Sequence, residues 1–372
     1  MIYVLKRFLW RFAAQVVFFI ATLRKRAKSF VAYRITKSFE RYVVVKEFET
    51  VSSNGLAIVA LYPRQGILKS AIRLIDSLIT SNYSVLVVVN ESQLSSEWLS
   101  VLSTKPIEVI TRPNIGRDFG AYKIGFQYAE EKGFLTRVDN LLFANDSVLY
   151  GPNSNEFVLA MLKIDAPWLS MFVNYEFHIH AQSFFQVFQK EIFLRKDFSK
   201  FWHNYTPSEL RIHTIVRGEL ALSAQCLSRG ESPIAFVTAT AILANSAFKK
   251  FAPDEEFGIL NYPRIPVKNE NPTTKEDLKT LMREQFLETN VTHSMGLLAA
   301  RVLSAPLKLD INATGLITKD GVTNTLESMG FQEQETIELV QIIMSKSPDE
   351  TFRGYKRLRF LVAKWCFQGL AK

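Results

Sequence analysis

The stretch TRPNIGRDFGAYKIGFQYAEEKGFLTRVDNLLFANDSVLYGP, residues 111–152, decides the fold. It opens with a polar turn, NIGRD at residues 114–118, and its apolar residues then recur at helical spacing, which predicts a helix over about residues 119–132. A short apolar strand follows over residues 141–144 and ends at the polar triplet NDS, residues 145–147. Because ligands of open α/β sheets bind at the carboxyl edge of the strands, this triplet marks a candidate binding site.

Strands and helices alternate upstream of this stretch. Buried strands are predicted over residues 56–62, 85–89 and 107–110, with a helix over residues 68–80. This order predicts an α/β fold with a mainly parallel sheet and helices on both faces. Three polar residues follow the ends of these strands and should line one crevice: Tyr62, Asn90 and Asn114.

The downstream half is predicted to end in a helical region. Aromatic-rich strands are expected over residues 168–178 and 183–193, a helix over 216–230 and a last strand over 234–243. A proline-rich loop at residues 261–274 precedes four expected helices, at residues 275–288, 292–303, 322–329 and 335–344. The expected organisation is therefore a basic N-terminal segment (1–50), an α/β domain (51–255) and a helical C-terminal region with a basic tail (256–372).

Three motifs in order carry a resemblance to a known family. They are N-x-G-R-D-x-G at residues 114–120, N-D-S-x-x-G-P at residues 145–152 and H-x-Q-S-F-F at residues 180–185. This set resembles the rhamnan synthesis protein F family. More broadly, the order of turn, helix, strand and acidic triplet is similar to the nucleotide-sugar domain of inverting GT-A glycosyltransferases. The resemblance implies a GT-A-like, Rossmann-like fold.

The resemblance also implies a site for a nucleotide-sugar donor. The NDS triplet stands where those enzymes carry a DxD motif, so Asp146 is the expected ligand of a divalent cation, Mg²⁺ or Mn²⁺. Since Asn145 is neutral, the cation is expected to be weakly held or dispensable, with Arg117 gripping phosphate oxygens instead. The alternative for the triplet is a turn or a helix cap. The expected donor-binding residues are Tyr62, Asn90, Asn114, Gly116, Arg117, Asp118, Asn145, Asp146 and Ser147.

Glu219 is the first candidate for the catalytic base. The segment from Gly218 to Gly230 is similar in outline to the motif that holds the base in family-2 transferases, although Leu220 replaces its second acid. We expect Glu219 at the first turn of its helix, where the helix dipole would keep it ionised; the alternative is an ordinary exposed helix glutamate. Asp118 and His180 are the other candidate proton acceptors. The alternative for Asp118 is a surface ion pair with Arg117, and the alternative for His180 is a structural role in the core. The expected acceptor-site residues are His180, Gln182 and Ser183.

The function implied by the resemblance is inverting transfer of a sugar. The donor would be dTDP-β-L-rhamnose, and the acceptor a lipid-linked saccharide of a bacterial surface polysaccharide such as O-antigen lipopolysaccharide. The incomplete DxD and Glu-Asp motifs leave an alternative open. In that alternative the chain is a non-catalytic glycan-binding or scaffold subunit of a polysaccharide assembly complex.

The positive charge is concentrated at the N-terminus. The chain has a net charge of +9, and residues 1–50 hold eleven Lys and Arg against three Glu. A nucleic-acid-binding protein would carry basic charge on its folded domain, so no nucleic-acid partner is expected. The apolar run at residues 12–23 is shorter than the ~20 residues of a spanning helix and is flanked by basic residues. This pattern predicts a helix lying on an anionic membrane; a tilted span that includes residues 8–10, or a helix docked on the protein itself, are the alternatives.

The basic, aromatic tail at residues 351–372 resembles the N-terminal segment. It either contacts the same membrane or forms a cationic helix that packs on its own domain. The two cysteines, Cys226 and Cys366, are too few for a disulfide scaffold and fit a reducing compartment. Together these features predict a peripheral protein at the cytoplasmic face of the bacterial inner membrane.

Removing residues 1–30 should abolish binding to anionic vesicles, because the deleted segment carries both the apolar run and its basic flanks. Vesicle flotation of the full and shortened chains at low and high salt measures this effect. Equal flotation of the full chain with neutral and anionic vesicles would contradict the electrostatic part. Resistance to alkaline extraction would favour the spanning helix.

Overall fold

The computed structural model describes residues 41–48, 54–63, 68–175, 179–245, 290–314 and 317–345. Five expectations lie outside these residues: the membrane-binding segment, the boundary near residue 255, the proline-rich loop at 261–274, the helix at 275–288 and the basic tail. Within the described ranges, no helix is both long enough and apolar enough to cross a membrane.

An eight-stranded sheet in the order β1-β4-β3-β2-β5-β10-β7-β11 forms the centre of the protein. Its strands are β1 (Val43–Lys46), β2 (Gly55–Leu61), β3 (Tyr83–Val89), β4 (Glu108–Thr111), β5 (Asn140–Asn145), β7 (Trp168–Ser170), β10 (Phe185–Gln189) and β11 (Ile234–Ala235). Only β1 and β10 run against the other six strands. The predicted mainly parallel α/β sheet is therefore confirmed.

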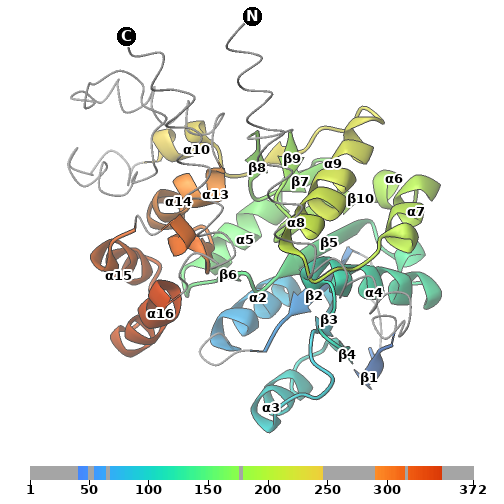
Figure 1. Ribbon diagram of the computed structural model, residues 1–372, viewed down its shortest axis with the longest axis horizontal. Coiled ribbons are helices and arrows are strands. Elements are labelled where there is room, and N and C mark those ends of the chain that lie inside the picture. The colour runs from blue at the N-terminus through green and yellow to red at the C-terminus, as the bar shows by residue number, and fades with distance from the viewer. Residues whose placement is uncertain are drawn as a thin grey trace, which may run out of the picture.

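Helices cover both faces of this sheet (Figure 1). Successive side chains of a strand point to opposite faces, so Ala57, Val59 and Leu61 of β2 enter one core and Leu56, Ile58 and Ala60 enter the other. The first core is closed by α2 (Leu68–Thr80) and α5 (Ser154–Leu162), and α3 (Ser96–Ser103) also packs into it. The second core is closed by α4 (Arg117–Glu131), α6 (Lys190–Phe193) and α7 (Lys196–Asn204).

The sheet has a switch point between β2 and β5. From β2 the chain builds β3 and β4 on one side, and α4 then returns it to β5 on the other side. Because β2 and β5 are parallel neighbours, their carboxyl ends meet at one edge. There the backbone N–H of Tyr62 donates a hydrogen bond of 2.7 Å to Asp146 Oδ2. The polar residues predicted to share a crevice lie at this edge.

Two predicted strands are shorter than expected. The strand predicted over residues 183–193 ends at Gln189, because its partner strand β5 begins at Asn140, opposite Gln189, and the chain continues as α6. The strand predicted over residues 234–243 is β11 followed by α10 (Ala239–Ala244). Thr238 starts that helix, since its side chain accepts a hydrogen bond from the backbone N–H of Ala241.

The strand predicted over residues 168–178 is also divided. Its first part is β7, and a separate two-stranded ribbon follows, made of β8 (Val173–Asn174) and β9 (His180–Ala181). Residues 176–178 lie outside the described residues.

The C-terminal region contains α13 (Val291–Ser294), α14 (Gly296–Leu303), α15 (Lys319–Ser328) and α16 (Glu333–Ser345). These helices confirm the expected helical stretches at 292–303, 322–329 and 335–344. They share the core that α2 and α5 close, and a short strand, β12 (Leu307–Lys308), pairs antiparallel with β6 (Val148–Leu149). The described C-terminal residues thus continue the packing of the sheet domain.

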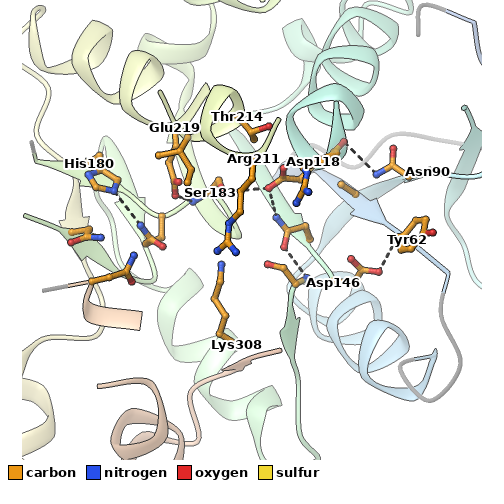
Figure 2. Close-up of a pocket in the computed structure, with 18 of the residues that line it drawn as sticks. Tyr62, Asn90, Asp118, Asp146, His180, Ser183, Arg211, Thr214, Glu219 and Lys308 are labelled. Atoms are coloured by element: carbon orange, nitrogen blue, oxygen red, sulfur yellow. Dashed lines mark hydrogen bonds between the residues drawn. The ribbon is translucent and has the colours of Figure 1, made fainter. Parts of the chain in front are cut away.

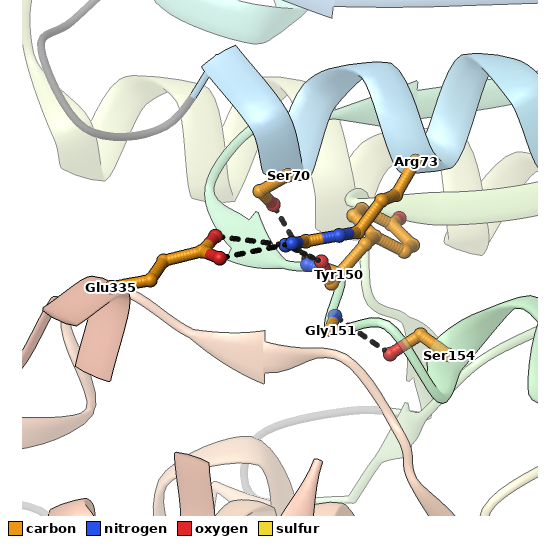
Figure 3. Close-up of polar contacts among 6 residues, drawn as sticks. All are labelled: Ser70, Arg73, Tyr150, Gly151, Ser154 and Glu335. Atoms are coloured by element: carbon orange, nitrogen blue, oxygen red, sulfur yellow. Dashed lines mark hydrogen bonds and ion pairs between the residues drawn. The ribbon is translucent and has the colours of Figure 1, made fainter. Parts of the chain in front are cut away.

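An ion pair fastens α16 to α2 (Figure 3). Arg73 donates two hydrogen bonds of 3.0 Å to the carboxylate of Glu335, and its guanidinium lies 5.0 Å from the ring centroid of Phe331. It also donates to the carbonyl of Tyr150. Next to it, a Cβ on Gly151 would lie 2.8 Å from the carbonyl oxygen of Met329, so the glycine of the N-D-S-x-x-G-P motif allows the C-terminal region to approach.

Glu335→Ala should lower the free energy of unfolding by about 1–3 kcal/mol, because it leaves the half-buried Arg73 without its carboxylate. Glu338→Ala is the matched control on an exposed position of the same helix and should change stability little. Urea unfolding of both variants measures the difference. Equal losses would show that the ion pair does not hold α16.

Candidate functional site

A cavity of about 500 Å³ opens at the carboxyl edge of the sheet (Figure 2). The structure brings together in its lining twelve of the thirteen residues proposed from sequence for donor binding, acceptor binding or catalysis: Tyr62, Asn90, Asn114, Arg117, Asp118, Asn145, Asp146, Ser147, His180, Gln182, Ser183 and Glu219. They come from six separate segments of the chain. The sequence motifs therefore converge on one site.

Both the oxygen and the nitrogen of the Asn145 side-chain amide form hydrogen bonds within the protein. Its Oδ1 accepts a hydrogen bond of 2.9 Å from the backbone N–H of Ser147, which closes the turn after β5. Its Nδ2 donates to Asp118 Oδ2 and to the Tyr122 hydroxyl, both at 3.0 Å. An aspartate at this position would set two carboxylates against each other. The departure from DxD is thus explained by Asp118, a carboxylate supplied by α4.

Asp118 joins α4 to the H-x-Q-S-F-F motif. Its Oδ1 accepts from the backbone N–H of Phe119 at 3.0 Å, and its Oδ2 also receives the Ser183 hydroxyl at 3.4 Å. The ion pairs among the described residues do not include one between Asp118 and its neighbour Arg117. The surface ion pair considered from the sequence is therefore not formed.

Gly116 is the one predicted donor-binding residue that does not line the cavity. Its φ of +82° favours glycine, and a Cβ there would lie 2.3 Å from the Cβ of Pro207. Its backbone N–H donates to Glu209 Oε1 at 3.1 Å. The glycine therefore lets the N-x-G-R-D turn adopt this backbone conformation and pack against residues 207–209, and its part in donor binding stays a prediction.

The sequence analysis missed Arg112, whose buried side chain supports the NIGRD turn at residues 114–118. This buried side chain donates hydrogen bonds of 2.5 Å to Asn90 Oδ1 and to the carbonyl of Ile115. Burial lowers its pKa to about 10, which leaves it charged at neutral pH, and Glu209 opposes that shift. Its only sequence signal is a cation directly after the apolar strand β4.

The helix that carries Glu219 begins earlier than predicted. It starts with α8 (Arg211–His213), widens into a π-helix over Thr214–Glu219 and continues as α9 (Leu220–Leu227). Glu219 therefore lies two turns inside the helix, and the expected stabilisation by the helix N-terminus is wrong. Short π segments inside helices occur frequently at functional sites.

Glu219 is buried and faces the H-x-Q-S-F-F motif. Its Oε1 accepts a hydrogen bond of 2.8 Å from the backbone N–H of Ser183. Burial raises its pKa above the ordinary glutamate value, although His180, Lys308 and the Ser183 N–H partly oppose this. It is therefore neither an exposed glutamate nor one ionised by the helix dipole. A carboxylate with raised pKa can accept a proton more readily near neutral pH.

The acceptor-site candidates surround Glu219. His180 and Gln182 are buried, and the His180 Nε2 and Gln182 Nε2 atoms lie 3.3 Å apart. The carbonyl of Ser183 accepts from the Tyr122 hydroxyl at 2.9 Å, which fixes the strand next to Glu219. Polar groups thus flank one side of the carboxylate.

Several lining residues were not predicted: Ala60, Asn174, Glu209, Arg211, Thr214, Ile215, Asn290, His293 and Lys308. Most of them come from the segment before Glu219 or from the C-terminal region. Their place in the site depends on how distant segments pack, and no local motif announces it. Arg211 and Lys308 add two cations to the cavity.

The described residues contain no group of three or more His, Cys, Asp and Glu side chains that could hold a metal ion. Asp146, the predicted ligand, accepts the Tyr62 N–H through Oδ2 and lines the cavity. One such carboxylate fits a cation that is held mainly by phosphate oxygens of a bound substrate, as Mg²⁺ often is. In that form the cation would help neutralise the phosphate charge.

One comparison with known proteins agrees with the sequence resemblance. Residues 86–230 match the family model described as rhamnan synthesis protein F, which confirms the resemblance for this part of the chain. This range contains Asp118, Asp146 and Glu219. No curated protein sequence matches the chain.

Two solved structures resemble the fold distantly. A putative glucose-1-phosphate thymidylyltransferase from Bacillus anthracis, in complex with a sucrose, is 10% identical with a TM-score of 0.32, over 50% of this chain and 87% of that chain. A mannosyltransferase from Pyrobaculum calidifontis, in complex with GDP-Man and Mn²⁺, is 10% identical with a TM-score of 0.31, over 90% and 97% of the two chains. At these values neither likeness indicates a substrate.

The pH dependence of stability should reveal the raised pKa of Glu219. As pH rises above the ordinary glutamate pKa, the unfolded chain loses the Glu219 proton before the folded chain does. The free energy of unfolding therefore decreases with pH until the folded pKa is passed, and this contribution is then constant. Glu219→Gln cannot titrate but keeps an oxygen for the Ser183 N–H. The stability of the normal chain relative to this variant should therefore fall as pH rises above about 4.5 in urea unfolding. A flat or rising difference would contradict the raised pKa.

Proposed function

We propose that this protein is an inverting glycosyltransferase that moves a sugar from a nucleotide donor onto a growing polysaccharide. The observation that carries the proposal is the placement of Glu219, a buried carboxylate, in the same cavity as Asp146 at the switch point of the sheet. The family match over residues 86–230 supports it.

The cavity offers separate surroundings for the parts of a donor. Its volume of about 500 Å³ is within the range of small-molecule sites, about 300–1,000 Å³. We place the base and ribose near Tyr62, Asn90 and Asn114, at the ends of β2, β3 and β4. The diphosphate then lies near Arg117 and Asp146, and Asp146 would hold a divalent cation that would help neutralise the phosphate charge.

The proposed reaction needs a base opposite the leaving diphosphate. Glu219 accepts the proton of the acceptor hydroxyl while that oxygen forms a bond to the anomeric carbon. The bond from this carbon to the diphosphate oxygen breaks, so the nucleoside diphosphate leaves and the configuration inverts. Asp118 is bonded to Asn145, Ser183 and the Phe119 N–H, which makes it a positioning group in this scheme.

The acceptor hydroxyl would approach from the side of His180, Gln182 and Ser183. Among the finer assignments, we propose L-rhamnose from dTDP-β-L-rhamnose as the sugar, which inversion would join in an α-linkage. The proposed acceptor is a lipid-linked saccharide, reached from the cytoplasmic face of the membrane through the basic N-terminal segment. The family match supports rhamnose only through the name of the family.

Glu219→Gln should lower turnover by about two to four orders of magnitude while donor affinity changes little, because only the proton acceptor is removed. Asp146→Asn should instead weaken donor binding, mainly in the presence of Mg²⁺ or Mn²⁺. Sugar transfer from dTDP-, UDP- and GDP-sugars to extracted lipid-linked saccharides measures turnover, and titration calorimetry measures binding.

Two results would contradict the proposal. Binding of glycan without transfer or hydrolysis of any donor would favour the non-catalytic subunit. A Glu219→Gln variant that retains more than about a tenth of normal turnover, in an assay limited by chemistry, would remove Glu219 as the base. His180 would then be the next proton acceptor to test.

A further inference from the structure

Two cations that no sequence motif predicted face each other across the cavity. Arg211 reaches into it from α8, and Lys308 reaches toward the same space from β12 (Figure 2). Like charges that point at one another repel unless an anion lies between them. Their arrangement therefore needs a physical reason.

Lys308 is held in place by the NDS turn itself. In the pairing of β12 with β6, Lys308 lies opposite Val148, and the backbone N–H of Leu309 donates to the carbonyl of Ser147 at 2.9 Å. The ammonium lies 4.8 Å from the ring centroid of Phe184, in the H-x-Q-S-F-F motif. Among the described residues no ion pair or hydrogen bond involves this ammonium, although its charge acts on the carboxylates of Asp310 and Glu219. Its N–H groups can therefore donate to an anion in the cavity.

Arg211 is oriented by Asp310. One guanidinium nitrogen of Arg211 lies 2.8 Å from Asp310 Oδ2, and His293 Nε2 lies 3.5 Å from Asp310 Oδ1. Burial opposes the charged form of Asp310. Lys308, His293 and Arg211 outweigh that cost and hold the pKa of this carboxyl well below its usual range. The carboxylate thus stays ionised and fixes the guanidinium at the wall of the cavity.

A diphosphate matches this pair of cations in charge and in shape. Guanidinium groups bind phosphate oxygens through two parallel hydrogen bonds, and ammonium groups bind them as compact point charges. Two carboxylates, Asp310 and Glu219, lie near these cations. Among the described residues only Asp310 forms an ion pair with either cation, and Glu219 accepts the Ser183 N–H. A bound diphosphate would supply further negative charge and would reduce the repulsion between the cations.

We propose that Arg211 and Lys308 form a diphosphate clamp that binds the phosphates of the donor without requiring a metal ion. The clamp rests on the proposed glycosyl transfer and adds to it the C-terminal strand β12, which lies outside the matched residues 86–230. In this arrangement the two cations stabilise the charge that develops on the leaving nucleoside diphosphate. A divalent cation held at Asp146 would add to donor affinity without being required for binding.

Titration calorimetry with inorganic pyrophosphate, and separately with dTDP, tests the clamp in the presence of EDTA. Lys308→Met keeps an aliphatic side chain against Phe184 but removes the charge. Arg211→Gln removes the guanidinium group, with its charge and its paired N–H donors. Each should weaken binding about tenfold or more, because each removes a charge-assisted contact. Lys308→Arg keeps the charge and should bind within about threefold of the normal chain.

Matched controls lie outside the cavity. Arg229→Gln breaks an Arg–Asp pair of similar geometry, 3.1 Å from Arg229 to Asp197, and Lys319→Met removes an exposed lysine of α15. Neither should alter binding. Unchanged affinity in Lys308→Met and Arg211→Gln, loss of binding in Lys308→Arg, or loss of normal binding in EDTA would each overturn the clamp.

The clamp and the transferase can fail separately. Unaltered sugar transfer by Lys308→Met and Arg211→Gln would overturn the clamp and leave the proposed function standing. Pyrophosphate binding with the expected variant pattern, but no transfer from any donor, would support the clamp and overturn the proposed function.

Discussion

The parallel pairing of β2 with β5 is the constraint on which the site depends. It brings Tyr62, at the end of one strand, within a 2.7 Å hydrogen bond of Asp146, just past the end of the other. Residues that are 84 positions apart in the chain therefore meet at one edge of the sheet. Once this edge is set, the turn at Asn145 can bind Asp118, and α4 is thereby fixed over the cavity.

The C-terminal region completes the site from the opposite wall. Pairing of β12 with β6 places Lys308 beside the NDS turn, while the Arg73–Glu335 ion pair holds α16 against α2. Gly151 permits this contact because any side chain there would meet Met329. The N-D-S-x-x-G-P motif therefore has two roles. Its first three residues line the cavity, and its glycine allows the C-terminal helices to pack close.

The parts of the fold with a local signal could be predicted from the sequence. Buried strands such as β2 and β3 are continuous apolar runs, and the three motifs supplied nine of the 21 residues that line the cavity. Glu219 was placed in the right cavity for a wrong reason, because nothing in the sequence marks the π-helix that extends its helix back to Arg211. Arg211 and Lys308 were missed since their position depends on pairing between distant segments, and Gly116 packs on Pro207 without lining the cavity.

A crystal structure of the protein with a bound nucleoside-diphosphate sugar would show the donor's place directly. We expect the diphosphate between the Asp146 edge and the pair formed by Arg211 and Lys308. We also expect the anomeric carbon to face Glu219, with the base near Tyr62 and Asn90. A donor bound outside this cavity, or one whose diphosphate lies away from both Asp146 and Lys308, would contradict this placement.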